Sequence, residues 1–182
     1  GGRRGGGAAK PQLYISTDTG SSWRLSTAGL PPGSIAAIRE DTENPQLIFA
    51  AADSGVFVSF DGGSQWQSLE LNLPASAVTD LQIEQSHLVI STYGRGLWSL
   101  DDIGSLRQMA NVDATTAPYL FQPTPAIRLQ WDDYTDTPIN PDEPHSPNPP
   151  DGAVLAYYLP QANAKISLNI YDSSNTLVNS YS

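Results

Sequence analysis

The chain has 182 residues, of which 39% are hydrophobic and 15% are charged, and it contains no Cys. Nineteen acidic residues against nine basic ones give a formal net charge of −10, which repels nucleic-acid phosphates and anionic lipid surfaces. The missing thiol excludes disulfide scaffolds, cysteine nucleophiles and Cys-ligated metal centres. No apolar run reaches the roughly 18 residues that a membrane-spanning helix needs. We therefore expect no nucleic-acid partner and no membrane partner.

Residues 1–10 (GGRRGGGAAK) are dominated by glycine. Glycine-rich chain has little apolar surface to bury, so we expect a flexible segment here. Its two Arg and one Lys are too few for nucleic-acid binding, which agrees with the acidic balance of the whole chain.

An internal repeat occupies residues 11–110. Residues 16–23 (STDTGSSW) match residues 59–66 (SFDGGSQW) at an offset of 43 residues, and the shared pattern is Ser-x-Asp-x-Gly-x-x-Trp. Further along, residues 47–50 (LIFA) align with residues 88–91 (LVIS) at an offset of 41 residues. A period of 41 to 43 residues is typical of β-propeller blades and overlaps some helical repeats.

The local pattern within one repeat favours strands over helices. No stretch has a sustained apolar period of about 3.6 residues. Instead, short segments rich in Val, Ile, Phe or Trp are each bounded by turn residues. These segments span residues 35–39, 46–51, 55–60 and 65–69. Four antiparallel strands per repeat are the arrangement of a propeller blade, so we predict an all-β fold.

The predicted blades do not add up to a closed ring. Residues 13–27 supply the last two strands of one blade, residues 33–72 make a whole blade, and residues 77–102 make the first three strands of another. Propellers close with about four to eight blades. We therefore expect a partial β-propeller of little more than two blades, whose structural partners are the remaining blades of a larger protein.

The rest of the chain predicts a helix, a linker and a second β-unit. A short helix is expected over residues 105–109 (SLRQM). Residues 111–151 form an expected irregular linker, because residues 132–151 contain six Pro, six acidic residues and no base. Residues 152–182 are expected to begin a β-sandwich with a three-stranded antiparallel meander. The strands of this meander span residues 153–159, 165–171 and 176–181.

The repeated motif is suited to holding a reverse turn. An Asp at the turn entry accepts hydrogen bonds from backbone N–H groups that the reversing chain leaves unpaired. The Gly supplies a positive φ, and the Trp opens the outgoing strand, where we expect its ring to be buried between adjacent sheets. The residues concerned are Ser16, Asp18, Gly20 and Trp23 in the first copy and Ser59, Asp61, Gly63 and Trp66 in the second.

Both copies resemble Asp-boxes, the signature of the BNR-repeat propellers of sialidases, xyloglucanases and the sortilin N-terminal domain. Residues 53–63 (DSGVFVSFDGG), 91–102 (STYGRGLWSLDD) and 148–154 (NPPDGAV) are similar to large bacterial proteins described as glycosyl hydrolase-like or sortilin-like BNR-repeat proteins. In those proteins a propeller precedes a short Ig-like or FlgD-like β-domain. The resemblance covers most of the chain after Pro11. It implies that the Asp-boxes are structural and that the protein is secreted or periplasmic.

Departures from the family limit what the resemblance implies. The third repeat has Leu100, Asp101 and Asp102 where the Asp-box turn would lie, which indicates the last blade, where the chain leaves the ring. The chain lacks the cysteines of the disulfide-bearing animal sortilins, and no Arg triad of a sialidase can be recognised in it. We therefore expect neither a sorting receptor nor a sialidase.

Tyr93, Arg95 and Trp98 are the best candidates for contact with a ligand. A Gly-Arg-Gly turn between two strands can present a guanidinium beside aromatic rings, a combination suited to carbohydrate or peptide ligands. The structural alternative, which we favour, is that Arg95 pairs with Asp101 or Asp102 and that Trp98 belongs to the core.

The acidic residues predict no catalytic site and no metal site. Asp18 and Asp61 occupy equivalent positions of neighbouring blades, whereas the two carboxyl groups of a glycoside hydrolase must lie within about 5–10 Å of each other. The acidic residues of the linker could bind Ca²⁺, but their spacing matches no recurrent loop and the prolines oppose folding around an ion. They are Asp132, Asp133, Asp136, Asp142 and Glu143, with His145 beside them. We expect a solvated linker and no cofactor.

We expect the chain to be a non-catalytic part of a larger BNR-repeat propeller protein, with a scaffold role and a ligand- or protein-binding role. The alternative is a glycoside hydrolase whose catalytic carboxylates lie on blades outside these 182 residues. Turnover of a polysaccharide by the whole protein would distinguish the two hypotheses.

Overall fold

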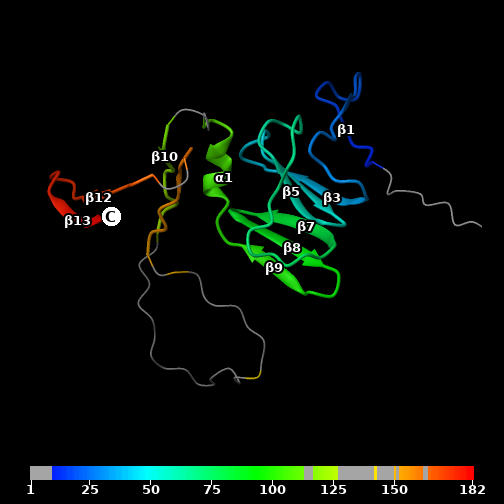
Figure 1. Cartoon of the computed structure of the whole chain (residues 1–182). Helices are drawn as coiled ribbons and strands as arrows, with labels where there is room; N and C mark the ends of the chain where they lie inside the picture. Colours follow the sequence, from blue (N-terminus) through cyan, green and yellow to red (C-terminus); the bar gives the residue numbers. More distant parts are fainter. Residues whose placement is uncertain (1–9, 113–116, 127–141, 143–149, 151, 162–163) are drawn as a thin grey trace, which may run out of the picture.

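The computed structural model describes residues 10–112, 117–126, 142, 150, 152–161 and 164–182. Within these residues the fold is mostly β, with several small antiparallel sheets and one short helix, α1 (Gly104–Met109), where the sequence predicts a helix (Figure 1). No helix in the described part of the chain is long and apolar enough to cross a membrane. The predicted flexible segment up to residue 9 lies outside the described residues. So do most of the predicted linker and all of its acidic candidates except Asp142.

Nine strands form three successive sheets in which each strand pairs with its neighbour in the chain. The first sheet contains β1 (Tyr14–Ile15) and β2 (Arg24–Leu25). The central sheet contains β3 (Ile35–Glu40), β4 (Ile48–Ala52), β5 (Gly55–Ser59) and β6 (Gln67–Ser68). The third sheet contains β7 (Val78–Glu84), β8 (His87–Thr92) and β9 (Leu97–Leu100). The numbers of strands, two, four and three, agree with those predicted from the repeat.

The central sheet is covered on both faces, and β4 and β5 are buried along their whole length. One face packs against Leu13 and Ile15 beside the first sheet, and its buried residues are Ile48, Ala50, Ala52, Phe57 and Trp66. The other face packs against the third sheet, and the buried residues of that contact are Leu47, Phe49, Ala51, Val56, Val58, Val78, Leu81, Leu88 and Ile90. Side chains along a strand alternate between the two faces. A strand that is buried on both faces is therefore a continuous apolar run in the sequence.

The repeat persists in three dimensions, but its alignment in β4 and β8 differs from the predicted one. Phe57 of β5 pairs with Ala50, and Trp98 of β9 pairs with Ile90. Phe57 and Trp98 both face the preceding sheet, so Ala50 corresponds to Ile90 and not to Ser91. The predicted offset of 41 is wrong here, and the structural offset is 40, because the paired residues Ile90 and Trp98 are eight positions apart, whereas Ala50 and Phe57 are seven positions apart. A shift of one residue exchanges the two faces of a strand.

The described residues of the C-terminal part do not form the predicted three-stranded meander. They contain two separate strand pairs, β10 (Tyr119–Leu120) with β11 (Tyr157–Tyr158) and β12 (Leu168–Tyr171) with β13 (Leu177–Tyr181). β10 belongs to the predicted irregular linker, yet Phe121 directly after it is buried and its N–H donates to the carbonyl of Ala156 at 3.0 Å. A local pattern indicates a strand but not its partner, so pairing across some 37 residues could not be predicted.

Candidate functional site

The two copies of the repeated motif are called the Asp-box turns below, after the motif that they resemble. The first of them, between β1 and β2, is closed by its own polar side chains. Asp18 Oδ1 accepts hydrogen bonds from the Ser22 N–H at 2.8 Å and from the Ser16 hydroxyl at 2.9 Å, and Asp18 Oδ2 accepts one from the Ser22 hydroxyl at 2.6 Å. The Ser16 hydroxyl oxygen accepts the Gly20 N–H at 2.8 Å. These oxygens satisfy backbone N–H groups that the turn leaves without a strand partner.

The second Asp-box turn, between β5 and β6, repeats this arrangement. Asp61 Oδ1 accepts the N–H groups of Ser64 and Gln65, both at 2.9 Å, and the Ser59 hydroxyl at 2.8 Å. The Ser59 hydroxyl oxygen accepts the Gly63 N–H at 2.8 Å. In both copies, therefore, the carboxylate and the serine hydroxyl are engaged within the turn that carries them.

Both Asp-box carboxylates are stabilised in the ionised form. Hydrogen bonds from the Ser22 hydroxyl, the Ser22 N–H and the Ser16 hydroxyl lower the pKa of Asp18 from 3.8 to about 2. Partial burial raises the pKa of Asp61, but the hydrogen bonds of the turn, first among them that of the Gln65 N–H, together outweigh this effect and leave the pKa below its usual value. A carboxyl group with such a low pKa is a poor general acid near neutral pH.

Gly63 is required by the close approach of the second turn to the first sheet. Its φ is 80°, a backbone conformation that residues with a Cβ rarely adopt. A Cβ at this position would lie 2.3 Å from Ile15 Cδ1 and 2.9 Å from Ser26 Oγ. The Ser26 hydroxyl also donates a hydrogen bond to the carbonyl of Gly63. The second turn is thus fixed to the chain that leaves the first one.

The two tryptophans of the motif have different surroundings, which corrects the prediction that both are buried. Trp66 is 4% exposed, and its Nε1 donates to Ser26 Oγ at 3.1 Å. Trp23 is 63% exposed, and its Nε1 donates to the carbonyl of Gly20 in its own turn at 3.1 Å. Trp66 packs toward the first sheet, whereas no sheet among the described residues covers the equivalent face of the first sheet.

The third repeat continues into α1 at the place where the first two have an Asp-box. The Ser99 hydroxyl donates to Asp101 Oδ1 at 2.6 Å, which resembles the Ser-to-Asp hydrogen bond of the two boxes. Asp102 Oδ1 accepts the Gly104 N–H at 2.8 Å where the helix begins. Both carboxylates are therefore engaged beside the helix, and the Asp-x-Gly turn is absent from this repeat.

The β8–β9 hairpin carries the three candidate ligand residues, of which two are exposed. Tyr93 is 80% exposed, and Arg95 is exposed as well. Within the described residues the Arg95 side chain has no hydrogen bond and no ion pair, so the favoured pairing with Asp101 or Asp102 is not found. Trp98 is half-buried, packs against the core between the central and third sheets, and donates from Nε1 to the carbonyl of Arg95 at 3.0 Å.

Several hydrogen bonds hold the backbone of this hairpin. The Thr92 N–H and hydroxyl both donate to the carbonyl of Gly96, at 3.1 and 2.8 Å. The Tyr93 N–H donates to the carbonyl of Ala77 at 2.8 Å, and the Ser76 hydroxyl donates to that of Tyr93 at 3.2 Å. Exposed side chains on a fixed backbone lose less conformational entropy when a ligand binds.

A partly buried ionic cluster is centred on Arg107 of α1, a residue that the sequence did not identify as a functional candidate. Arg107 Nε and Nη2 donate to the two carboxylate oxygens of Asp41 at 2.9 and 2.8 Å. The side chains are 11% and 0% exposed, respectively. The Glu43 carboxylate and the Ser86 hydroxyl lie 3.0 and 3.1 Å from Arg107 Nη1.

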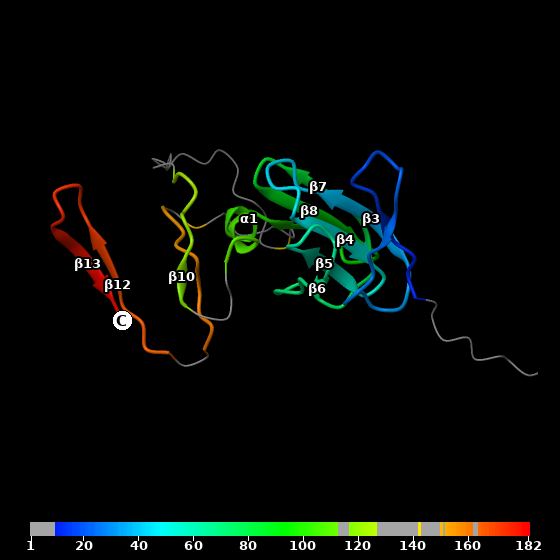
Figure 2. The same ribbon diagram turned by 90° about the horizontal axis from the view of Figure 1, so that it is seen from above.

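This cluster joins three elements of the fold. Asp41 directly follows β3 of the central sheet, Ser86 lies between β7 and β8 of the third sheet, and Arg107 belongs to α1. Figure 2 shows α1 between these sheets and β10. Because Asp41 and Arg107 are 66 residues apart, no local sequence pattern could identify them as partners.

We expect Asp61→Ala to lower the free energy of unfolding by about 1–2 kcal/mol, the usual cost of losing a cap or turn hydrogen bond. The substitution leaves the N–H groups of Ser64 and Gln65 without their acceptor. Urea denaturation followed by tryptophan fluorescence measures the change. Asp61→Asn, which keeps an acceptor oxygen, is the matched control and should cost less. An unchanged midpoint for Asp61→Ala would show that the carboxylate does not hold the turn.

The described part of the chain contains no group of three or more residues that could hold a metal ion. No model of a known protein family matches the sequence, and no curated protein matches it significantly.

Proposed function

We propose that this chain is a non-catalytic part of a larger BNR/Asp-box propeller protein, with a scaffold role and a ligand- or protein-binding role. In this proposal the central sheet is one complete blade, and the first and third sheets belong to its neighbours. Three observations support it: the four antiparallel strands in chain order, the packing of both faces of the central sheet, and the repeated Asp-box turn.

The hydrogen bonds of the Asp-box carboxylates are the main support for the proposed scaffold role. Asp18 and Asp61 each accept backbone N–H and serine hydroxyl groups from their own turn, and each pKa is lowered. A glycoside hydrolase needs a carboxylic acid whose pKa is raised so that it can protonate the leaving group. The hydrogen bonds around Asp18 and Asp61 lower the pKa of each carboxyl group instead of raising it, as expected for residues that stabilise turns.

Further repeat units are the proposed structural partners. Tyr14, Trp23 and Leu25 are exposed on the first sheet. At the matching positions of the central sheet, Phe57 and Trp66 are buried against the first sheet. A further sheet on the exposed face would bury its aromatic residues in the same way, and an uncovered apolar face of this kind is typical of an interaction surface.

The exposed end of the β8–β9 hairpin is the proposed contact for a carbohydrate or peptide ligand. Tyr93 offers an aromatic face, and Arg95 offers a guanidinium that is not engaged by another described residue. Trp98 supports this contact indirectly, because its Nε1 holds the carbonyl of Arg95. Tyr93 and Arg95 are therefore the contacting residues in the proposal, and Trp98 positions them.

Arg95→Ala is expected to weaken binding to the ligand by about tenfold or more. Binding of the intact chain is measured on an array of polysaccharide fragments and synthetic peptides, and the affinity for the best ligand is then determined by calorimetry. Arg39→Ala removes another partly exposed guanidinium and is the matched control, with an expected change of less than about twofold. Equal losses in both variants, or no binding to any member of the array, would contradict the proposed contact. Release of reducing sugar from a polysaccharide would contradict the non-catalytic role.

A further inference from the structure

The third sheet ends at β9, at the position where the central sheet has a further strand. β6 pairs with the outer edge of β5, whereas β9 pairs with β8 alone among the described residues. After β9 the chain enters α1 instead of returning along this edge. The backbone N–H and C=O groups of an unpaired edge can bind an additional strand.

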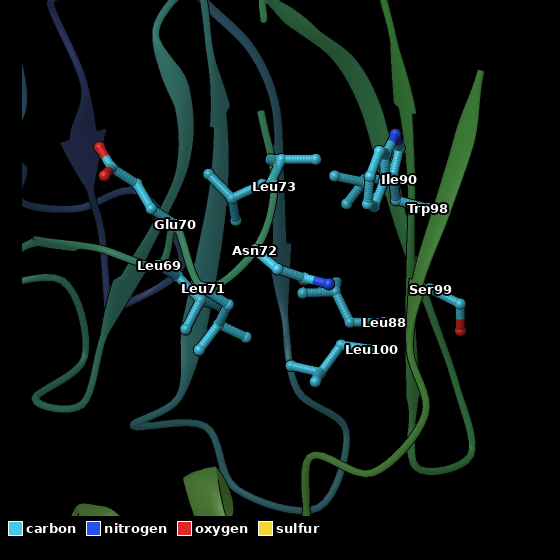
Figure 3. Close-up of a pocket in the computed structure, with 11 residues that line it drawn as sticks. Leu69, Glu70, Leu71, Asn72, Leu73, Leu88, Ile90, Trp98, Ser99 and Leu100 are labelled. Carbon is cyan, nitrogen blue, oxygen red and sulfur yellow. The ribbon is translucent and has the colours of Figure 1, made fainter. Parts of the chain in front are cut away.

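An apolar depression lies beside this edge, between the central and third sheets (Figure 3). Side chains from the chain after β6 face side chains of β8 and β9 across it, while Glu70 and Ser99 point away. The depression is open to solvent. Its apolar residues include Leu71, Leu73, Leu88, Ile90, Trp98 and Leu100.

One repeat earlier, the corresponding space is occupied by Trp66. The Trp66 N–H donates to the carbonyl of Ala28 at 2.8 Å, and the indole donates to Ser26 Oγ at 3.1 Å. The ring belongs to the same buried cluster as Phe57, which corresponds to Trp98 in the third sheet. In the central sheet, therefore, the residue directly before the fourth strand fills the space between two sheets.

Backbone hydrogen bonds establish this correspondence. The Leu30 N–H donates to the carbonyl of Thr27 at 3.1 Å, and 43 residues later the Leu73 N–H donates to that of Glu70 at 2.8 Å. Two further hydrogen bonds are related by the same offset. The Ser26 N–H donates to the carbonyl of Leu13 at 2.8 Å, and the Leu69 N–H donates to that of Val56 at 2.9 Å. Residues 69–73 are therefore equivalent to residues 26–30. Residues 26–30 lie against the central sheet and Trp66, and residues 69–73 lie in the same way against the third sheet.

Leu71 is a second, independent indication of a binding surface. Its φ is 44°, in the left-handed region that branched apolar side chains rarely adopt. Its side chain is also 70% exposed at the rim of the depression, so burial does not offset the backbone strain. Backbone strain of this kind is concentrated in segments that bind ligands.

We propose that β9 and this depression are the docking site of an extended strand that carries a tryptophan. The strand pairs with the free edge of β9 as β6 pairs with β5, and its indole fills the depression as Trp66 fills the space over the first sheet. The repeat defines the chemistry of the partner: a Trp, two polar residues and a Leu, as in residues 66–69 (WQSL). Main-chain hydrogen bonds supply affinity in such strand addition, and the side-chain pocket supplies specificity.

The test is a titration of a labelled synthetic peptide with the intact chain, followed by fluorescence anisotropy. The peptide has the sequence of residues 62–70 (GGSQWQSLE). We expect saturable binding of this peptide. The same peptide with Trp66→Ala should bind at least about tenfold more weakly. Equal binding of the two peptides, or no saturable binding of the first, would overturn the proposal.

Two substitutions in the protein locate the site. Leu71→Asp places a charge at the rim of the depression and should weaken peptide binding by about tenfold, and Asp tolerates the left-handed backbone of this position. Val178→Asp is the matched control, because Val178 is similarly exposed at 65% but belongs to β13 and does not line the depression. Equal losses in both variants would place the peptide elsewhere.

Two further results decide between this site and its competitors. Arg95→Ala should leave the peptide affinity unchanged, because the docking site rests on the internal repeat and not on the proposed hairpin contact. The second result concerns self-association of the chain. If the chain associates with itself, if Trp23→Ala abolishes this association and if the peptide competes with it, then a second copy occupies the depression and the proposed partner is wrong.

Discussion

Replacing Trp66 with Ala is expected to lower the free energy of unfolding by about 3–5 kcal/mol, the range for removal of a large buried aromatic side chain. The ring lies in the cluster between the first and central sheets. Its Nε1 also donates to the hydroxyl of Ser26, a buried residue that would lose this partner. Equilibrium urea denaturation of the intact chain measures the change. Far-UV circular dichroism is the suitable signal, because the substitution removes a fluorophore.

Trp23→Ala is the matched control for this experiment. Trp23 has the same place in the Asp-box motif as Trp66, but it is mostly exposed and its indole nitrogen bonds only within its own turn. We expect a loss of less than about 1 kcal/mol. If the two substitutions cost the same, the first sheet does not cover the central sheet in the way described.

Arg107→Met is expected to lower the free energy of unfolding by about 3–5 kcal/mol. The substitution removes the cation that faces the fully buried carboxylate of Asp41, so a buried charge is left unpaired. It also removes the hydrogen bonds by which the guanidinium joins α1 to the two sheets. Urea denaturation at neutral pH measures the loss, and hydrogen exchange of the α1 amides shows whether the helix opens first.

Two further variants test the reason for this loss. Arg39→Met breaks the more exposed pair with Asp80 at 3.2 Å, and should cost less than about 1 kcal/mol. Asp41→Asn added to Arg107→Met removes the unpaired charge, and should recover part of the loss. A cost for Arg107→Met no larger than that for Arg39→Met would mean that the cluster does not anchor α1.

The strands and turns of the repeat could be predicted because they depend on neighbouring residues. The hydrogen bonds that the Ser and Asp side chains of both Asp-boxes make join residues no more than four positions apart. β4 and β5 are apolar on both faces, so their positions follow from composition alone. The short helix after β9 was equally accessible to a local argument.

Long-range pairing could not be predicted in the same way. The alignment of β4 with β8 was wrong by one residue, because β4 and residues 88–90 of β8 are continuous apolar runs, and such a run does not show which residues face which side of the sheet. The pairing of β10 with β11 joins segments on opposite sides of the predicted linker. The Arg107–Asp41 pair depends on where α1 packs, and nothing near either residue identifies its partner.

By itself, the sequence determined that this chain makes short antiparallel strands joined by Asp-box turns, because those turns are closed by side chains of their own residues. Tertiary structure alone decided what each turn contacts. Trp23 and Trp66 occupy the same place in the motif, yet one is exposed and the other buried. The physical reason is that burial of the indole depends on whether another sheet packs against that face, and the residues of the motif do not specify this.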